Sequence, residues 1–349
     1  MRSDRLVGFV SELAPGSDGG ELRRLRLFLT ITVVATFALI VVGGVVRITD
    51  SGLGCGLAGT GLKGWPLCGG RALPLIQEKS VIEFSHRALA SIVVALILLC
   101  VWQARKLPGH TFLRRGTIAA AVLVLAQAVL GGLTVEHNLQ EVLVASHLGL
   151  AMLLLGTLIA LRWAASREQG VAAPQLRGRG LRPLATAASV LVLATVVAGG
   201  VIAGSEEEGV KNGVVNGAHL ACGEQFPGCN GKANPLPFGQ YGHLADIQLA
   251  HRALVYVTSL TILALLGLAL YRRVWSREFT ALGLLLALQF ALGVLNVLLG
   301  KHPVLIVAHL TTGTLLWAAA VTTTLRLSPV PQTASRPKAT EPETSAAPA

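Results

Sequence analysis

Long apolar runs separated by short polar segments dominate this chain. Each run is about 20 residues long, which at ~1.5 Å per helical residue is enough to cross a ~30 Å hydrocarbon core. Strands of a membrane barrel are a poor alternative, because the runs are too long and lack alternation of polar and apolar residues. The pattern predicts an all-α polytopic membrane protein with eight transmembrane helices. They lie roughly at Leu27–Val46, Glu83–Gln103, Thr117–Val135, Val142–Leu161, Pro183–Ile202, Ala245–Tyr271, Phe279–Leu299 and Val304–Leu325.

Composition and charge support a membrane protein. The chain has 349 residues, of which 52% are hydrophobic and only 13% charged, whereas soluble domains carry about a quarter of charged residues. The net charge of +11 could indicate a nucleic-acid partner. Most of the basic residues, however, lie before the first run, between alternate runs and after the last one. This positive-inside bias predicts cytoplasmic N- and C-termini. The basic residues are then explained by membrane topology, so we expect membrane lipid and no nucleic acid as a partner.

The N-terminal segment helps to predict the location. Its first 24 residues include Asp4, Glu12, Asp18 and Glu21, so they resemble neither a signal peptide nor an acid-poor transit peptide. A bacterial cytoplasmic membrane is therefore the simplest expectation, with the chain crossing it several times.

The chain divides into two similar halves. We expect a polar N-terminal arm (1–24), a four-helix half (25–161), a cytoplasmic linker (162–182), a second four-helix half (183–325) and a disordered cytoplasmic tail (326–349). His86-Arg87-Ala88-Leu89 matches His251-Arg252-Ala253-Leu254, 165 positions later, and His147 matches His309, 162 positions later. Four crossings per half give both halves the same orientation, which predicts a pseudo-two-fold axis along the membrane normal.

Four histidines stand at matched places in this repeat. His86, His147, His251 and His309 each lie early in a run that enters from outside, about 7–10 Å deep at ~1.5 Å per residue. Two imidazoles on facing helices at one depth can clamp a planar macrocycle, and histidine is a common axial ligand of haem iron. The alternative is four hydrogen-bonded core histidines. Zinc is less favoured, because no dense group of Cys, His and carboxylate residues accompanies them.

The neighbours of these histidines differ between the halves. Arg87 and Arg252 each follow a histidine, where they could pair with a haem propionate or snorkel to lipid head groups. Three residues before the histidine stands Glu83 in the first half and Gln248 in the second. A carboxylate at this depth is a functional-site candidate by default, the alternative being an ion pair with Arg87. The asymmetry indicates that one site performs chemistry and the other holds a resident cofactor.

Two outer loops carry paired cysteines, Cys55 with Cys68 and Cys222 with Cys229. The outer side is oxidising, so two disulfides within the loops are expected. A metal site using His219 near Cys222, or a thiol-redox role in passing electrons, remain alternatives. Cys100 lies at the inner end of a helix and is expected to be a packed small residue.

These motifs together resemble the haem A synthase family. Ser51-Gly52-Leu53-Gly54-Cys55, Trp65-Pro66-Leu67-Cys68-Gly69-Gly70, Glu83-Phe84-Ser85-His86-Arg87, Gly217-Ala218-His219-Leu220-Ala221-Cys222 and the two later histidines carry the resemblance, over about residues 25–325. The segment between Cys55 and Cys68 is longer than expected for the family.

The resemblance implies an oxidoreductase that converts the C8 methyl of haem O to the formyl group of haem A, for aa3-type terminal oxidases. Two hydroxylations followed by loss of water would make the formyl group. His251 and His309 would hold haem b, His86 and His147 the substrate haem, and Glu83 would be the catalytic carboxylate. Haem O synthase and oxidase assembly factors are expected partners; the electron acceptor cannot be named from the sequence.

Two histidines on the substrate iron would leave no position for dioxygen. Removal of electrons followed by addition of water fits that ligation better, with Glu83 handling the proton. Two other functions stay open: a di-haem b electron-transfer protein that works with quinone, and a haem carrier without chemistry. The first accounts for four histidines but not for a carboxylate in one half only.

Overall fold

A computed structural model describes residues 17–56, 59–74, 76–172, 176, 178, 180–205, 210–211, 214–215, 217–300 and 302–328. Within these residues the fold is helical, and eight helices are long and apolar enough to cross a membrane. The predicted all-α membrane class is confirmed. The helices are α2 (Ser17–Ile48), α3 (Glu78–Arg105), α4 (Thr111–Glu136), α5 (Glu141–Glu168), α6 (Leu181–Gly204), α7 (His243–Tyr271), α8 (Arg277–Leu298) and α9 (Pro303–Leu327).

The remaining regular structure lies in the loops that precede α3 and α7. Two short 3₁₀ turns, η1 (Gly61–Lys63) and η3 (Ala218–Leu220), stand in the loops that precede α3 and α7. Two two-residue strands, β1 (Val210–Lys211) and β2 (Val214–Val215), pair antiparallel after α6.

Several helices extend further than the apolar runs. Helix α2 begins at Ser17, inside the segment expected to be a polar arm, and α5 continues to Glu168, inside the expected linker. These turns carry charged residues but also bury Leu22, Leu25 and Ala165 in the core. An amphipathic stripe of this kind continues a helix although mean hydropathy falls. The rest of the expected arm (1–16) and of the expected disordered tail (329–349) lies outside the described residues.

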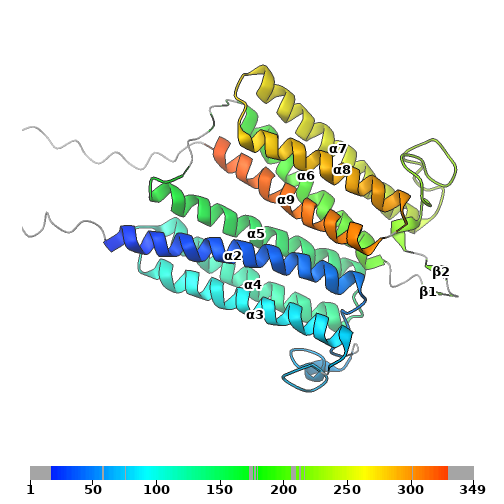
Figure 1. Cartoon of the computed structure of the whole chain (residues 1–349), viewed down its shortest axis with the longest axis horizontal. Helices are drawn as coiled ribbons and strands as arrows, with labels where there is room; N and C mark the ends of the chain where they lie inside the picture. Colours follow the sequence, from blue (N-terminus) through cyan, green and yellow to red (C-terminus); the bar gives the residue numbers. More distant parts are fainter. Residues whose placement is uncertain are drawn as a thin grey trace, which may run out of the picture.

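Helix contacts close into two rings. Helices α2, α3, α4 and α5 pack in order with α5 returning to α2, and α6, α7, α8 and α9 do the same. Figure 1 shows these two groups lying side by side. Each group has its own buried apolar cluster, one centred on α2 to α5 and one mainly on α6 to α9. The pseudo-two-fold axis between the groups stays a prediction.

Four helices form the boundary between the groups. Helices α2 and α5 contact α9, and α5 also contacts α6. At this boundary the Trp317 indole N–H donates to the Met152 carbonyl oxygen at 2.9 Å, and its ring covers Gly156. The contacts are close-packed and mostly apolar, as expected for small and aliphatic residues between membrane helices.

The outward faces of the flanking helices are apolar. Val122 on α4 is 62% exposed, and Leu260 on α7 and Leu284 on α8 are each 67% exposed. In water so many exposed large apolar side chains would be a liability. In a bilayer they face lipid, so their exposure agrees with a multi-pass membrane protein.

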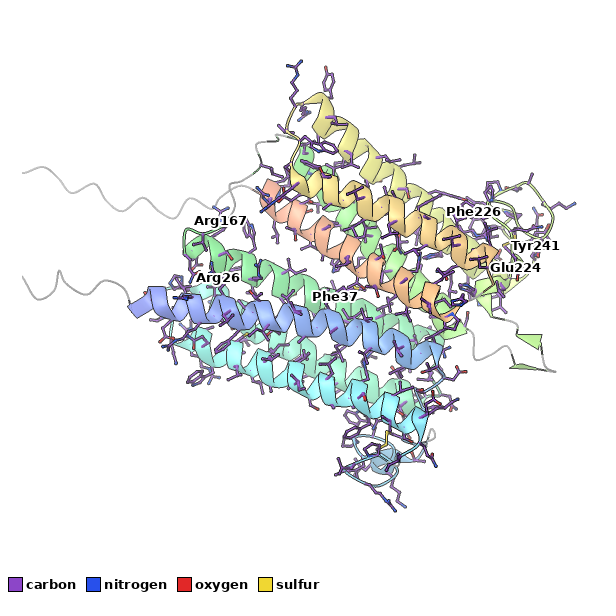
Figure 2. The ribbon with its side chains drawn as sticks, in the orientation of Figure 1. Arg26, Phe37, Arg167, Glu224, Phe226 and Tyr241 are labelled. Atoms are coloured by element: carbon purple, nitrogen blue, oxygen red, sulfur yellow. A yellow bond between two sulfur atoms is a disulfide. The ribbon has the colours of Figure 1, made fainter. Side chains whose placement is uncertain are left out.

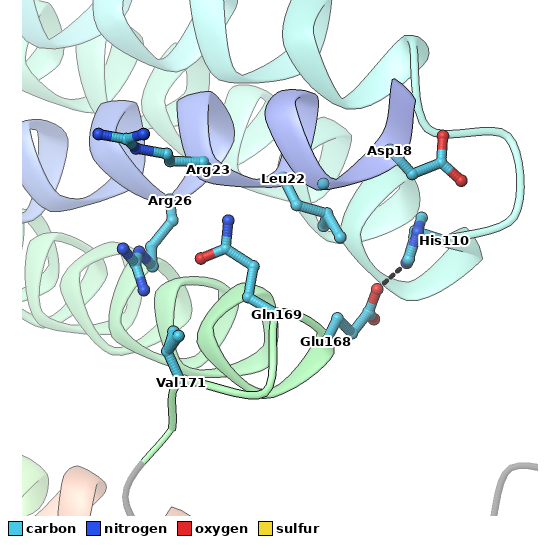
Figure 3. Close-up of a pocket in the computed structure, with 9 residues that line it drawn as sticks. Asp18, Leu22, Arg23, Arg26, His110, Glu168, Gln169 and Val171 are labelled. Carbon is cyan, nitrogen blue, oxygen red and sulfur yellow. Dashed lines mark ion pairs between the residues drawn. The ribbon is translucent and has the colours of Figure 1, made fainter. Parts of the chain in front are cut away.

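The two ends of the helix bundle differ in chemistry. Figure 2 shows Arg26 and Arg167 at one end, and Glu224, Phe226 and Tyr241 on the loop before α7 at the other end. At the arginine end a pocket of about 580 Å³ lies between the start of α2, the start of α4 and the end of α5. Figure 3 shows the ion pair of His110 with Glu168 in it, beside Arg23 and Arg26. None of the predicted site residues lines this pocket.

Candidate functional site

The four predicted histidines lie in pairs at the end of the bundle opposite that pocket. His86 on α3 and His147 on α5 belong to the first ring, and His251 on α7 and His309 on α9 to the second. Each lies within the first three turns of its helix and is half-buried. In each ring the two histidine-bearing helices are not neighbours in the ring order, α3 with α5 and α7 with α9. The structure therefore places two of the predicted histidines in each ring, on helices that lie across the ring from each other.

Each imidazole rests against a glycine of the preceding helix. A Cβ atom built on that glycine would lie only 3.0–3.4 Å from the imidazole Cε1 atom, closer than carbon atoms normally approach. A glycine is thus what lets each ring approach the neighbouring backbone. The pairs are Gly43 with His86 at 3.1 Å, Gly131 with His147 at 3.0 Å, Gly199 with His251 at 3.4 Å and Gly293 with His309 at 3.2 Å.

The ring nitrogens are used differently in the two pairs. His251 Nδ1 lies 3.1 Å from the Thr195 carbonyl oxygen, to which it can donate while Nε2 stays available as a ligand. Among the described residues, the Nδ1 atoms of His86, His147 and His309 are buried without a hydrogen-bond partner. The Gln289 amide nitrogen lies 3.1 Å from His309 Nε2. Because these Nδ1 atoms are buried, Nε2 is the ring nitrogen that each of these histidines can offer to a bound group.

Glu83 and Gln248 occupy matched positions beside the histidines. The Cys55 backbone N–H donates to Glu83 Oε2 at 2.7 Å, and the Cys222 N–H donates to Gln248 Oε1 at 2.9 Å. Both side chains are buried, at 3% and 4% exposure. The second oxygen of Glu83 pairs with Arg87, whereas the amide nitrogen of Gln248 donates to the His219 carbonyl oxygen at 2.6 Å. The ion pair that the sequence left open is therefore present.

Arg87 and Arg252 hold the two loops that carry the cysteine pairs. Arg87 Nη1 donates to the carbonyl oxygens of Gly64 and Leu67 at 2.8 and 2.9 Å. Arg252 donates to the carbonyl oxygens of the corresponding loop positions, Gln225 and Gly228, both at 2.9 Å. Neither guanidinium snorkels to the surface: Arg252 is 5% exposed and the Arg87 side chain 15%. Because each arginine directly follows a histidine, the same helical turn carries the histidine and holds the loop.

Both cysteine pairs form disulfides. Cys55–Cys68 and Cys222–Cys229 have S–S distances of 2.07 and 2.08 Å. In each loop the residue after the second cysteine donates its backbone N–H to the carbonyl oxygen of the first, Gly69 to Cys55 and Asn230 to Cys222. Cys100 is buried, as expected. With Cys222 oxidised, no thiolate is left for the alternative metal site with His219.

No group of three or more His, Cys, Asp or Glu side chains suited to a metal ion occurs among the described residues. His219 instead lies on η3 with its Nε2 3.4 Å from the Asn296 carbonyl oxygen. Paired histidines, rather than a ligand cluster, are thus the metal-binding chemistry that this part of the chain offers. Two imidazoles on opposite sides suit the iron of a planar macrocycle.

Sequence reasoning missed residues whose role depends on a distant helix. The four glycines that face the histidines, Gly43, Gly131, Gly199 and Gly293, were not among the predicted site residues. The available signal was spacing, because Gly131 and Gly293 are 162 positions apart, as are His147 and His309. The same spacing relates Gln127 and Gln289. Gln127 donates to the His147 carbonyl oxygen at 2.8 Å.

Two four-helix rings, each with a pair of half-buried histidines near a disulfide-linked loop, define a polytopic membrane protein with two similarly arranged sites. Comparison with known proteins identifies the family. Residues 26–321 match the COX15-CtaA family, described as cytochrome oxidase assembly protein, and the chain belongs to it.

Curated relatives carry one name. The chain is similar to the "Heme A synthase" of Halalkalibacterium halodurans, 27% identical over 292 residues that cover 82% of this chain and 91% of that protein. It is 28% identical to that of Shewanella oneidensis over 318 residues, with the same two coverages. The protein of that name from Shouchella clausii is 30% identical over 246 residues, which cover 70% of this chain and 74% of the relative.

Proposed function

We propose that this chain is a haem A synthase that oxidises the C8 methyl group of haem O to a formyl group, for use in terminal oxidase assembly. The name of the relatives supports the reaction class. The feature of the chain that carries the proposal is one difference between the two histidine sites, Glu83 in the first against Gln248 in the second.

The side chains present fit haem. Each pair supplies two imidazoles against glycine backbone, and no group of three or more His, Cys, Asp or Glu side chains suited to a bare metal ion occurs among the described residues. At His251 the hydrogen bond to Thr195 leaves Nε2 to face a ligand. At His309 an iron ion on Nε2 would take the place of the Gln289 N–H.

The two sites have different roles in this proposal. His251 and His309 hold a resident haem b, which supplies one-electron chemistry when bound. His86 and His147 bind the substrate haem O. Support comes from the carboxylate, which stands only beside the first pair, and from the hydrogen bond to a carbonyl oxygen that orients His251. No hydrogen bond found in the described residues uses the Nε–H of Arg87 or Arg252, so this donor is left for a haem propionate.

Glu83 is the proposed proton acceptor. Conversion of a methyl group to a formyl group with oxygen from water releases four protons and four electrons, and the electrons must pass to an external electron acceptor. With both axial positions of the substrate iron taken by histidine, water is the oxygen source that needs no vacant metal position. The Cys55 N–H and Arg87 hold the carboxylate at a defined place. Gln248 cannot accept a proton, so the second site does not perform this step.

The site also has a proposed place in the cell. The histidine pairs and disulfides lie at the outer face of a bacterial cytoplasmic membrane, with both termini of the chain in the cytoplasm. Support comes from the basic residues at the opposite end, Arg26 and Arg167 among them (Figure 2). Haem O synthase and oxidase assembly factors are the partners we expect.

Identification of haems by mass after extraction tests the function. The protein would be expressed beside a source of haem O, as wild type, Glu83→Gln and Gln248→Glu. We expect haem b and haem A in wild type. Glu83→Gln should keep haem b and lower haem A at least tenfold, because its amide cannot take the proton. Gln248→Glu is the matched control and should still yield haem A.

Other results would favour the other functions. Haem b alone at about two per chain in wild type would indicate an electron-transfer protein. Haem O bound but unconverted would indicate a carrier. Full haem A production by Glu83→Gln would remove the proton-accepting role and leave Glu83 as a partner of Arg87.

A further inference from the structure

Each Gly-Gly pair at the outer ends of α2 and α6 has one glycine facing a histidine of its own half and one facing the other half. Gly43 contacts His86, whereas a Cβ on Gly44 would overlap the Leu310 Cδ2 atom of α9. Gly199 contacts His251, whereas a Cβ on Gly200 would lie 3.0 Å from the Ala145 Cα atom of α5. The second glycines therefore decide how closely the two halves approach.

The partners of these glycines stand next to the other half's histidines. Leu310 directly follows His309 in the sequence. Leu148 directly follows His147, and its Cδ2 atom would lie 3.4 Å from a Cβ on Gly200. Two contact chains result, and each joins a histidine of one site to a histidine of the other. They run His86–Gly43–Gly44–Leu310–His309 and His251–Gly199–Gly200–Leu148–His147.

We propose that Gly44 and Gly200 are positioning residues that couple the two histidine sites, so that the placement of a histidine in one half depends on the helix packed against it from the other half. The inference rests on the proposed function in one respect, the resident haem at His251 and His309. Close-packed interiors pass small displacements from one side chain to the next. Coupling between sites is reciprocal, so binding of the substrate haem changes the surroundings of haem b.

A purely structural role predicts something else. If these glycines only let helices approach, as small residues do in many membrane proteins, enlarging one should lower the stability of the whole chain. It should not change the ligand geometry at a haem in the opposite half. A spectroscopic signature of that haem therefore separates the two roles.

The full-length protein tests this in a His147→Ala background, in which only the second pair can clamp a haem. Gly44→Ala lies in the first half, but through Leu310 it should alter the low-spin EPR g-values of the second-half haem. It should also change the rate of haem loss by roughly 2- to 30-fold. Gly267→Ala is the control, because nothing lies within 4 Å of a Cβ at this helical glycine.

A second variant pair keeps the test decisive if Gly44→Ala folds poorly. Leu310→Ala removes the atom that the new Cβ would overlap, so Gly44→Ala should have no further effect in that background. Loss of the effect in this double-mutant cycle supports coupling through the contact. Unchanged g-values and haem loss in Gly44→Ala, with haem b bound, overturn the coupling alone. Absence of haem from the His147→Ala parent and from wild type overturns the proposed function as well.

Discussion

The glycines that face the histidines determine how each imidazole lies. A ring resting on backbone has little freedom to turn, because the helix behind it is held by its own hydrogen bonds. The approach is closest at Gly131, where a Cβ would lie 3.0 Å from His147 Cε1. Overpacking at such a contact costs about 1–3 kcal/mol, so these glycines are as specific a requirement as the histidines.

Gly293→Ala should therefore weaken binding of the resident haem about tenfold, since a penalty of ~1.4 kcal/mol is a factor of ten in affinity. Its Cβ would press on His309. Gly131→Ala, the equivalent change in the first half, should leave the haem b content unchanged and reduce substrate-haem binding instead. Haem per chain, measured after purification, checks both. Equal loss of haem b in the two variants would contradict the assignment of each glycine chiefly to the histidine of its own half.

Glu83 shows how a residue can have a structural and a chemical role at once. Its carboxylate accepts a backbone N–H of the loop and pairs with Arg87. The functional role of the carboxylate, and the contrast with Gln248, could be proposed from the sequence. Both follow from the residue that stands three positions before a histidine in each half. The sequence did not predict the Cys55 contact, which depends on how an irregular loop folds back.

At the scale of elements, the disulfide loops are attached to the helices chiefly by arginine. Arg252 reaches the carbonyl oxygens of Gln225, Pro227 and Gly228, and its guanidinium lies 5.7 Å from the Phe226 ring. Hydrogen bonds to charged groups contribute about 1.5–3 kcal/mol each. Loop order should thus depend on these donors as well as on the disulfide.

Arg252→Ala should raise the hydrogen-exchange rate of the loop amides between Cys222 and Lys232 by about tenfold or more, because three carbonyl oxygens of the loop lose their charged donor. Exchange measured by mass spectrometry on the detergent-solubilised protein would report it. Arg277→Ala serves as the control, since this arginine is 83% exposed and pairs only with the adjacent Glu278 in the described residues. Unchanged loop exchange in Arg252→Ala would mean that the disulfide alone holds the loop.

The helices themselves were well predicted from the sequence, and their ends were not. Apolar runs of about 20 residues leave little alternative in a bilayer, which is why all eight helices could be placed. The extra turns at Ser17 and Glu168 are amphipathic and gain stability from packing of residues such as Leu25 against neighbouring helices. That packing is tertiary, so hydropathy along the chain does not reveal it.

At the scale of the whole molecule, the candidate site and the basic residues lie at opposite ends of the helix bundle. The histidine pairs, disulfides and short strands lie at one end, and Arg26 and Arg167 at the other. The loop between α3 and α4 is at the basic end and the loop before α7 at the histidine end. Sequence predicted this division from the distribution of arginine and lysine.

Single cysteines in these two loops should report the orientation. Gln240→Cys, in the exposed loop before α7, should react in intact cells with a membrane-impermeant maleimide. Gly109→Cys, in the exposed turn between α3 and α4, should react only after the membrane is opened. Cys100 is 1% exposed and the other cysteines form disulfides, so background labelling should be low. The reverse pattern would place the histidine sites on the cytoplasmic side.

Because two four-helix rings are joined in one chain, their two sites can differ in sequence. A symmetric dimer of a single four-helix protein would carry the same residue at both sites, because both copies come from one sequence. Here the segment between α5 and α6 ties the rings together, so one position can be glutamate while its counterpart is glutamine. Covalent linkage also makes assembly of the two rings independent of protein concentration. Two related sites in one chain can therefore take different roles, which the two identical sites of a homodimer cannot.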